Sequence, residues 1–390
     1  MTKLLELEKA GVAILAPRNC VLGHDPCGGS EVVLWRDANL IAEAGIPVRM
    51  YARAARKGAP VKRVLTRTNS PLITSLEYCG KFLLRERGAV VMSQNEPTLA
   101  GLAPDRAIVR YEWSTPHPQY WKLPGWLGRF QRAFYLFPSR DERRIFQHAH
   151  PQIPGESQFV MPYGIDLSVF KPSMQQPQPA LRVGFAGQWV PRKGINALLD
   201  AWQKVREAIP AAELHMLDGS SLWKVDFQIP GVAESIARVR KEESKGTLHV
   251  RPALAHAQMP EFWNSVSMAV VPSLYEPLAG VVLEAMACGI PVVASNVGGF
   301  PDMIEDGKNG LLFPRGDATA LARVITQLLT DDSLRQRLAA GARRRAEEFS
   351  LERRRSDLLA LLHLRMDPLN QELKKRIRFS QDHANTKGTE

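Results

Sequence analysis

The chain has 390 residues, of which 45% are hydrophobic and 23% are charged, and its formal net charge is +11. This length exceeds what one ordinary hydrophobic core accommodates, so we expect two domains. The sequence has no apolar run of membrane-spanning length, and Glu6 and Glu8 stand where a signal peptide needs an apolar core. We therefore expect a cytoplasmic protein whose membrane contact, if it has one, is peripheral.

The four cysteines carry no signature of a disulfide framework or a zinc site, because no two of them form a Cys-x-x-Cys pair. They are Cys20, Cys27, Cys79 and Cys288. This usage is typical of a reducing compartment and agrees with a cytoplasmic location.

The first third of the chain alternates strand and helix signals. Residues 12–17 form an apolar run that predicts a buried strand, a loop leads to Cys27-Gly-Gly-Ser-Glu31, and a helix is expected through about Ala44. Residues 47–51 predict the next strand. Gly28 and Gly29 allow the backbone in this loop to approach a ligand closely, although a glycine pair is also common in ordinary turns.

A basic segment follows, because residues 44–76 contain no acidic residue. Its basic residues are Arg49, Arg53, Arg56, Lys57, Lys62, Arg63 and Arg67. Residues 1–180 hold 23 basic and 15 acidic side chains, against 28 and 25 in residues 181–390, so the excess lies in the first half. The segment predicts a positive potential that attracts an anionic acceptor or an anionic membrane surface; a solvated surface is the alternative.

Further along, residues 107–113 predict a strand, and His117 lies in the loop after it. Residues 135–139 predict another strand that ends at Ser139. The polar, proline-bearing stretch 171–180 is the expected linker between an N-terminal domain, residues 1–170, and a C-terminal domain, residues 181–350.

The second domain opens with a predicted strand at 181–187, a loop at 188–194 and an amphipathic helix at 195–208. Arg192 and Lys193 lie directly before this helix. Two cations beside a helix N-terminus suit a diphosphate, because they add side-chain donors to the positive end of the helix dipole. A solvated basic loop is the alternative.

A second strand, loop and helix follow at residues 268–289. Residues 268–272 predict a buried strand, Pro277 fits the first turn of a helix, and Gly289 fits its end. Leu278, Ala279 and Gly280 are then expected to form an exposed N-terminal turn whose N–H groups can hold a diphosphate. We expect a ligand at this turn to touch both Glu276 and Glu284, whose carboxylates accept hydrogen bonds from sugar and ribose hydroxyls. The alternative is an N-cap carboxylate and a solvated helix glutamate.

The alternation of strands and helices predicts an α/β protein with two doubly wound, Rossmann-like parallel sheets and a binding site in the cleft between them. Helical sequence resumes after Ala318. The arginine triplets 343–345 and 353–355 are expected on helix exteriors, and residues 380–390 are expected to be disordered.

The run Glu284-Ala-Met-Ala-Cys-Gly-Ile-Pro-Val-Val-Ala294, followed by Gly-Gly-Phe-Pro-Asp at 298–302, resembles the signature of the retaining glycosyltransferases of family 4. The resemblance implies a GT-B fold and transfer of a sugar from a nucleotide-sugar donor to an acceptor hydroxyl with retained configuration. A role in glycan, polysaccharide or glycolipid synthesis is implied, with a glycan or a lipid-linked acceptor. It also implies that Glu276 contacts the donor sugar and Glu284 the ribose.

The same resemblance extends to weaker motifs. Lys193 matches a lysine of the family, whereas Gln188 occupies its arginine position, so Arg192 is expected to supply that charge. Gly28 and Gly29 resemble the glycine loop of the acceptor-side domain, and His117 is the nearest counterpart of a histidine near the reacting sugar. The resemblance further implies that a helical segment at 351–379 crosses back to the first domain. Leu278 and Ala279 replace the Phe-Gly usual in the family.

No Asp-x-Asp occurs in the chain, so the carboxylate pair that often holds a divalent ion on a diphosphate is missing. We expect transfer without an obligatory metal or other cofactor, with Arg192, Lys193 and the N–H groups of residues 278–280 stabilising the departing diphosphate.

Three other functions are alternatives to sugar transfer. A non-hydrolysing nucleotide-sugar epimerase can share the fold. A nucleic-acid binder is suggested only by the pI of about 9.6, without a recognised module, so no nucleic-acid partner is expected. A dinucleotide oxidoreductase would need a Gly-x-Gly-x-x-Gly after a strand, which the chain lacks.

Overall fold

The structure, a computed structural model, describes residues 7–17, 21–22, 29–52, 54–55, 61–64, 71–112, 128–173, 181–218, 229–370 and 372–373. His117, Gly28 and the expected tail 380–390 lie outside these ranges, as do residues 174–180 of the expected linker. The chain divides into two compact units, which we describe separately. Unit 1 comprises Met1–Tyr163 and Glu352–Glu390, and unit 2 comprises Gly164–Leu351.

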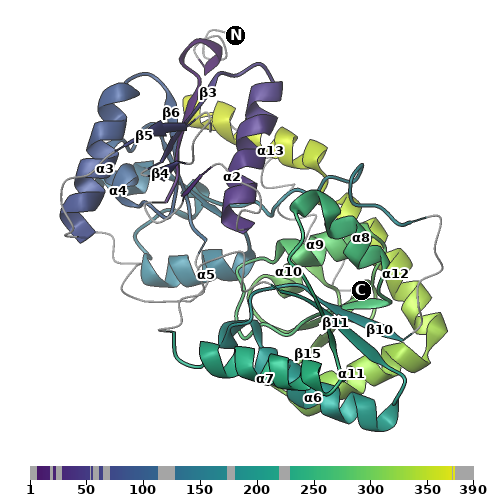
Figure 1. Cartoon of the computed structure of the whole chain (residues 1–390). Coiled ribbons are helices and arrows are strands. Elements are labelled where there is room, and N and C mark those ends of the chain that lie inside the picture. The colour runs from purple at the N-terminus through teal and green to yellow at the C-terminus, as the bar shows by residue number, and fades with distance from the viewer. Residues whose placement is uncertain are drawn as a thin grey trace. The chain divides into compact units, whose positions relative to one another are not determined.

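Unit 1 is built on a parallel sheet that has seven strands among the described residues, in the order β5-β3-β1-β6-β7-β8-β9 (Figure 1). The strands are β1 (Val12–Leu15), β3 (Val48–Ala52), β5 (Val61–Arg63), β6 (Val90–Gln94), β7 (Ala107–Arg110), β8 (Phe134–Phe137) and β9 (Gln158–Val160). A two-stranded sheet pairs β2 (Val21–Leu22) with β4 (Ala54–Ala55). The helices of unit 1 are α2 (Gly29–Glu43), α3 (Pro71–Arg85), α4 (Thr98–Leu102), α5 (Arg140–Ala149) and α13 (Leu351–Met366), with 3₁₀ turns η2 (Gly128–Arg132) and η3 (Gly155–Ser157).

Unit 2 contains a second parallel sheet, with six described strands in the order β12-β11-β10-β13-β14-β15. These strands are β10 (Arg182–Phe185), β11 (Glu213–Leu217), β12 (His249–Arg251), β13 (Met268–Val271), β14 (Val292–Ser295) and β15 (Gly310–Phe313). The helices are α6 (Ile195–Ala208), α7 (Val232–Ser244), α8 (Met259–Asn264), α9 (Gly280–Ala287), α10 (Phe300–Met303), α11 (Ala318–Thr330) and α12 (Asp332–Glu347), with 3₁₀ turns η4 (Pro191–Lys193) and η5 (His256–Gln258).

Each sheet reverses its strand order once. The chain begins near the middle of the sheet, adds strands outward on one side, and then returns to add strands on the other side. Such a sheet is doubly wound, and its central strands read as apolar runs because both faces are covered. The expectation of two Rossmann-like, doubly wound parallel sheets is confirmed.

Each unit also has its own hydrophobic core. In unit 1, Tyr111, Tyr135 and Phe137 surround Phe146, with ring centroids about 5 Å from it. In unit 2, α6 packs against α7 and α11 over one face of the sheet, and Trp202 of α6 is fully buried in that layer.

Helix α13 returns to unit 1 and is tied there by a buried arginine. Arg354 donates to both carboxylate oxygens of Asp37 on α2, at 3.0 and 2.6 Å, and to the carbonyls of Met161 and Pro162. Figure 1 shows α13 beside α2. The expectation that the arginine triplets lie on helix exteriors is wrong at Arg354 and at Arg345, which are 3% and 6% exposed. Backbone carbonyls accept hydrogen bonds from both guanidinium groups, and these bonds offset the free-energy cost of burying the charge.

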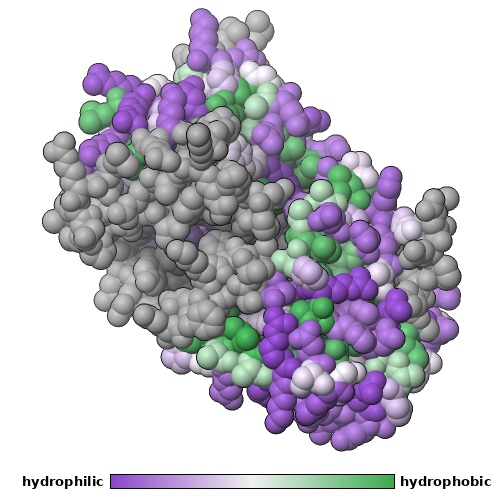
Figure 2. Space-filling view, viewed as in Figure 1, coloured by the Kyte–Doolittle hydropathy of each residue, from purple (hydrophilic) through white to green (hydrophobic). Residues whose placement is uncertain are grey.

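The surface of the described residues is mixed in character. On the face that Figure 2 shows, hydrophobic residues form separated patches among hydrophilic ones. Within the described ranges, no helix combines the length and the apolar character that crossing a membrane requires.

Two basic residues of the segment have partners within the described part of the chain. Arg49 forms an ion pair with Glu86 of the α3 end at 2.7 Å, so an acid from outside the segment neutralises it. Lys62 lies over the ring of Tyr51 at 5.5 Å. Arg53, Arg56, Lys57 and Arg67 lie outside the described residues, and the side chain of Arg63 is not among those described.

Candidate functional site

The candidate site of unit 2 lies where the strand order of its sheet reverses. Strands β10 and β13 are neighbours, with Gly184 opposite Ala269, but the chain leaves β10 toward β11 and leaves β13 toward β14. The loops after their carboxyl ends therefore diverge. Open α/β sheets bind ligands at this position.

The loop after β10 is held against the loop after β13 by backbone contacts. Gly194 has φ +74°, and a Cβ atom there would lie 1.8 Å from the Pro272 carbonyl oxygen, so only glycine allows this approach. In addition, the Leu274 N–H donates to the Arg192 carbonyl at 2.8 Å. The two loops are thereby fixed side by side.

This arrangement brings three of the predicted residues into one ion cluster. Lys193 Nζ donates to Glu276 Oε2, and Arg192 Nη1 lies 3.3 Å from the same oxygen. The Glu276 side chain is only 11% exposed, whereas those of Arg192 and Lys193 are 25% and 18% exposed. A buried carboxylate is thus compensated by two cations that reach solvent.

The glycine pair at 298–299 supports Glu276 from the other side. Gly299 N–H donates to the Glu276 carbonyl at 3.0 Å. Gly298 has φ +53°, and a Cβ atom there would lie 2.0 Å from the same carbonyl oxygen. Glycine is needed at position 298 because the backbone of this loop lies directly against that of Glu276.

Helix α9 begins later than the sequence predicts. It starts at Gly280, and the side chains of Leu278 and Ala279 are buried, at 3% and 4% exposure, rather than forming an exposed helical turn. Ala279 has extended backbone, and Pro277 lies outside the helix, because burial of these apolar side chains draws the chain inward before the helix starts. Gly280 is exposed, and no side chain caps the helix N-terminus.

Glu284 lies just over one turn into α9 and is 7% exposed. Trp263 Nε1 of α8 donates to Glu284 Oε2 at 3.2 Å, and His256 Nε2 of η5 lies 3.4 Å from Glu284 Oε1. His256 in turn packs edge-on against Phe170. Both carboxylate oxygens are therefore oriented by side chains from outside α9, and each retains a further lone pair for a ligand.

The helix ends at Ala287, and Gly289, the helix stop that the sequence predicts, follows two residues later with φ +71°. The neighbouring Cys288 is buried, and burial together with the charge of Glu284 raises the pKa of its thiol to about 12. The thiol therefore stays protonated at neutral pH and is a poor nucleophile.

The structure brings Glu276, Arg192 and Lys193 into direct contact and places Glu284 on the helix that follows. Gln188 is partly buried in the loop between β10 and η4. Gly29 is the first residue of α2 in unit 1. Sequence reasoning did not identify Trp263 and His256, because nothing in their local sequence indicates that α8 and η5 pack against α9.

Comparisons with known proteins agree with this geometry. Residues 170–345 match the family model of the glycosyl transferases group 1. The D-inositol 3-phosphate glycosyltransferase of Stackebrandtia nassauensis is 33% identical over 220 residues, covering 51% of this chain and 47% of the relative. The alpha-maltose-1-phosphate synthase of Mycolicibacterium smegmatis is 31% identical over 220 residues, covering 52% of this chain and 55% of the relative. The chain thus spans about half the length of the curated relatives it matches.

Solved structures resemble nearly the whole chain. The sucrose-phosphate synthase from Thermosynechococcus elongatus gives a TM-score of 0.70 at 21% identity, covering 94% of this chain and 100% of that one. HepE of Anabaena, solved in complex with UDP-glucose, gives a TM-score of 0.70 at 18% identity, covering 90% of this chain and 99% of that one. These likenesses confirm the expected GT-B fold. Residues 170–345 therefore resemble the glycosyl transferases group 1, and the two solved structures, both below 25% identity, show the fold alone.

Proposed function

We propose that this protein transfers a sugar from a nucleotide-sugar donor to an acceptor hydroxyl, with retention of anomeric configuration. The observation that carries the proposal is the contact of Glu276 with Arg192 and Lys193 at the carboxyl ends of β10 and β13, with Glu284 on the helix that follows β13. Names of relatives support it, since one is a glycosyltransferase and one fold neighbour was solved with UDP-glucose.

Each residue has a distinct role in donor binding. Glu284, held by Trp263 and His256, accepts hydrogen bonds from the ribose hydroxyls. The N-termini of α6 and α9 carry no side-chain cap, and their N–H groups and positive dipole ends stabilise the diphosphate.

Donor binding also rearranges the ion cluster. The diphosphate carries more negative charge than one carboxylate and competes with Glu276 for Lys193 and Arg192. Once these cations turn to the phosphates, the Glu276 carboxylate accepts hydrogen bonds from hydroxyls of the donor sugar. The same cations then stabilise the charge that develops on the leaving diphosphate.

The acceptor hydroxyl attacks the anomeric carbon from the face that the diphosphate leaves. The new glycosidic bond forms as the bond to the diphosphate breaks, and the proton of the hydroxyl passes to the departing phosphate. We propose that this sugar transfer needs no metal ion. We also propose that the acceptor is a glycan or a lipid-linked molecule and that the reaction belongs to the synthesis of a glycan, polysaccharide or glycolipid. EDTA should then leave the transfer rate unchanged.

A thermal-shift panel of UDP, GDP, ADP and their glucose conjugates tests donor binding. The preferred nucleotide should raise the melting temperature of the parent by mass action. Glu284→Gln should abolish most of this shift, whereas Glu276→Gln, which frees Lys193 and Arg192 for the diphosphate, should preserve or increase the shift from the bare nucleotide and reduce the extra shift from the sugar conjugate. Equal shifts in the parent and both variants would contradict the site.

Reaction type requires a separate experiment. Proton NMR of the parent with its preferred donor and a hydroxyl acceptor should show a product whose anomeric configuration matches that of the donor. Conversion of the donor sugar without any acceptor would instead support the epimerase, and an inverted product would contradict retention.

A further inference from the structure

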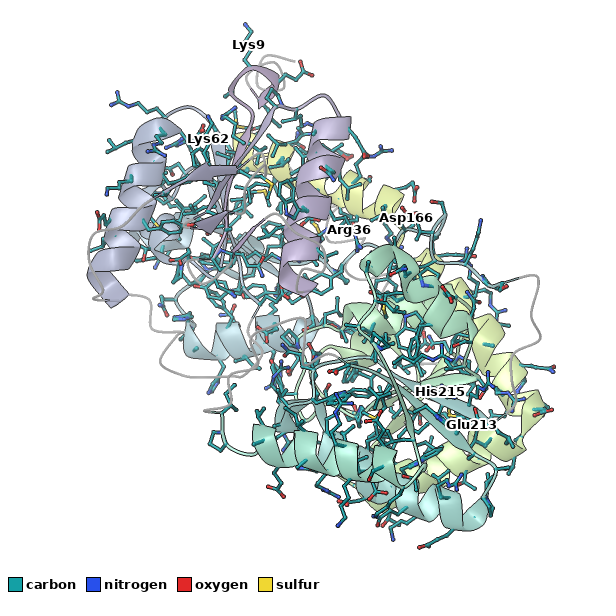
Figure 3. All side chains as sticks on the ribbon, viewed as in Figure 1. Lys9, Arg36, Lys62, Asp166, Glu213 and His215 are labelled. Carbon is teal, nitrogen blue, oxygen red and sulfur yellow. The ribbon has the colours of Figure 1, made fainter. Side chains whose placement is uncertain are left out.

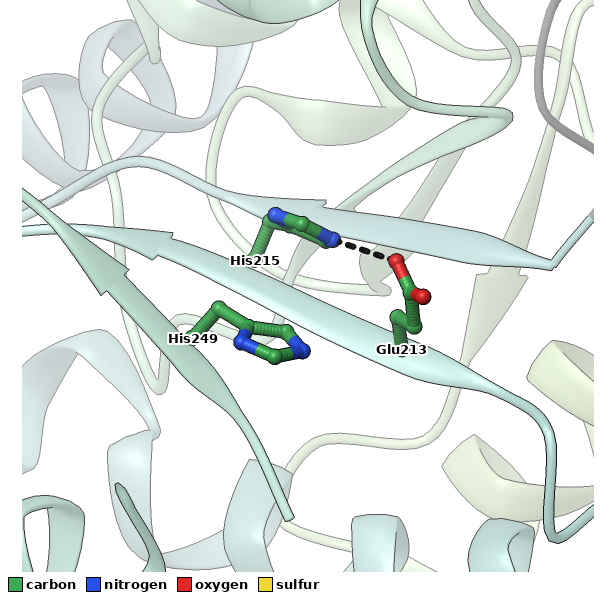
Figure 4. Close-up of side chains that lie close together, drawn as sticks. All are labelled: Glu213, His215 and His249. Carbon is green, nitrogen blue, oxygen red and sulfur yellow. Dashed lines mark hydrogen bonds and ion pairs between the residues drawn. The ribbon is translucent and has the colours of Figure 1, made fainter. Parts of the chain in front are cut away.

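A second cluster of chemically active side chains lies on a different part of unit 2, on strands β11 and β12. Glu213 and His215 are two residues apart on β11 and therefore point to the same face of the sheet. His249 of β12 is the register partner of His215. Figure 3 shows Glu213 and His215 close together on the sheet, and Figure 4 shows His249 beside them.

The three side chains lie close enough to share one ion. His215 Nε2 and Glu213 Oε2 are 2.9 Å apart, the two imidazole rings are 5.0 Å apart, and one ligand atom from each residue lies within 4.8 Å of the others. Tetrahedral zinc separates its nitrogen and oxygen ligands by about 3.4 Å, given bond lengths near 2.1 Å. His249 is exposed on the edge strand β12, so a small movement of its side chain can bring its ligand atom from within 4.8 Å of the others to the spacing that zinc requires.

The burial of His215 is not explained by packing alone. Its side chain is 8% exposed, and among the described residues no hydrogen-bond partner reaches its Nδ1 atom. Burying an imidazole with one nitrogen unpaired costs free energy that an aliphatic residue would not.

We propose that Glu213, His215 and His249 form a binding site for a divalent transition-metal ion, with Zn²⁺ as the ion whose ligand preference fits best. Two imidazoles and one carboxylate form a set of three protein ligands with the fourth position left for water. Arg182 Nε donates to Glu213 Oε2 at 2.8 Å and orients the carboxylate, as partners of metal ligands commonly do.

A bound ion would join the edge strand β12 to its neighbour β11. The cluster lies nearer the amino ends of these strands, whereas the donor-binding residues follow the carboxyl ends of β10 and β13. The proposed metal site is therefore independent of the proposed function, and its occupancy does not take part in sugar transfer.

One nearby cation opposes metal binding. Arg182 is neutralised by Glu213, but Arg251 lies two residues after His249 on β12 and repels positive charge near His215. Two kinds of substitution should therefore have opposite effects on metal affinity. Loss of a ligand should weaken metal binding, whereas loss of the Arg251 charge should strengthen it.

The experiment is equilibrium dialysis of the full chain, free of any polyhistidine tag, against Zn²⁺ near neutral pH. The parent should bind one ion per chain, and Co²⁺ in its place should give the strong visible absorption of a tetrahedral site. His249→Gln should weaken binding at least about tenfold, since even loss of a residue that only orients a ligand costs ~10- to 100-fold. Arg251→Gln should bind more tightly than the parent.

Two further variants complete the design. His148→Gln changes an exposed histidine on α5 and should leave zinc affinity unchanged. His249→Gln should retain the nucleotide-induced thermal shift of the parent, which shows that it is folded. Zinc binding by His249→Gln equal to that of the parent, weaker binding by Arg251→Gln, or no binding by the parent would each overturn the proposal.

Discussion

Two side chains from outside α9 hold Glu284 in place. The indole N–H of Trp263 and the imidazole of His256 each contact one carboxylate oxygen, so the side chain is oriented before any ligand arrives. Preorganisation of this kind lowers the entropy lost on binding. We therefore propose that Trp263 is a positioning residue, which acts on a bound nucleotide only through Glu284.

Trp263→Phe should weaken binding of the preferred nucleotide about fivefold to tenfold, because a lost hydrogen bond to a charged group costs ~1.5–3 kcal/mol, part of which water recovers. The matched control is Trp202→Phe, which removes an indole N–H that donates to the Thr247 carbonyl at 2.7 Å in the same unit. Both tryptophans are buried, so both variants should lose stability. Isothermal titration calorimetry should show weaker nucleotide binding by Trp263→Phe than by Trp202→Phe. Equal affinities in the two variants would show that Trp263 does not position Glu284.

The sequence identifies the two acids of the proposed donor site better than their partners. Glu276 and Glu284 lie in one strand, loop and helix, so their neighbourhood can be inferred from local patterns. The Glu276 contact with Lys193 joins residues 83 positions apart, and it was not predicted as an ion pair because both residues were assigned to the ligand. The cluster of Glu213, His215 and His249 depends on strand register, which the sequence does not specify.

At the scale of elements, glycines determine how closely the loops of the site approach. Gly194 and Gly298 both have positive φ and both lie against a carbonyl oxygen of the loop after β13. The strand-to-helix connections of unit 2 are therefore fixed relative to each other by backbone contacts, before any side chain contributes.

Gly298→Ala should displace Glu276 and weaken binding of the sugar conjugate more than that of the bare nucleotide. The new Cβ atom would meet the Glu276 carbonyl oxygen at 2.0 Å. Gly307→Ala is the control, because Gly307 has φ +75° with open space around it, so it should show only the backbone strain, ~1–2 kcal/mol. Donor affinity and urea denaturation check both effects, and normal discrimination between conjugate and nucleotide in Gly298→Ala would refute the role of this contact.

The start of α9 illustrates why helix boundaries are hard to predict. Pro277 is favourable in a first helical turn, and on this basis the helix is expected to begin there. In the structure, burial of Leu278 and Ala279 outweighs this local preference and delays the helix to Gly280. The existence and end of the helix were predictable because its apolar periodicity and Gly289 are local signals.

Arg354 attaches α13 to α2 of unit 1 through a buried ion pair with Asp37. Arg354→Met should destabilise the protein by about 3–5 kcal/mol, because it leaves the buried Asp37 carboxylate with a single arginine, Arg110 at 3.2 Å. Arg355→Met, on the next residue of the same helix, removes only an exposed pair with Glu43 at 3.9 Å and should cost about 0–1 kcal/mol. Equal denaturation midpoints for the two variants would contradict this assignment.

At the scale of the whole molecule, the alternation of strands and helices was enough to predict the fold class. Buried strands such as β1 and β13 read as short apolar runs, and each is followed by a helix signal. The order of strands within each sheet was not predictable from those runs, yet it is this order that brings β10 beside β13 and so creates the site.

Buried ion pairs also give the molecule an acid-sensitive stability. Burial raises the pKa of Asp37, but the charges of Arg354 and Arg110 more than offset it, and the net pKa lies below its ordinary value. The ionised group therefore stabilises the fold above the pKa of the unfolded chain, about 3.9, and this contribution is lost as pH falls below it. Urea denaturation between neutral pH and about pH 3 should show this loss, and Arg354→Met should show a smaller one; an equal or larger loss in the variant would contradict the linkage.

We propose that a nucleotide sugar binds at the carboxyl ends of β10 and β13. Hydrogen–deuterium exchange of the full chain, with and without its preferred nucleotide sugar, tests this most directly because it reports on every peptide of both units at once. We predict slower exchange in peptides covering residues 188–194 and 274–284, and no such protection in Glu284→Gln at the same ligand concentration. Protection confined to other segments, or unchanged exchange in these two loops under saturating ligand, would contradict the account.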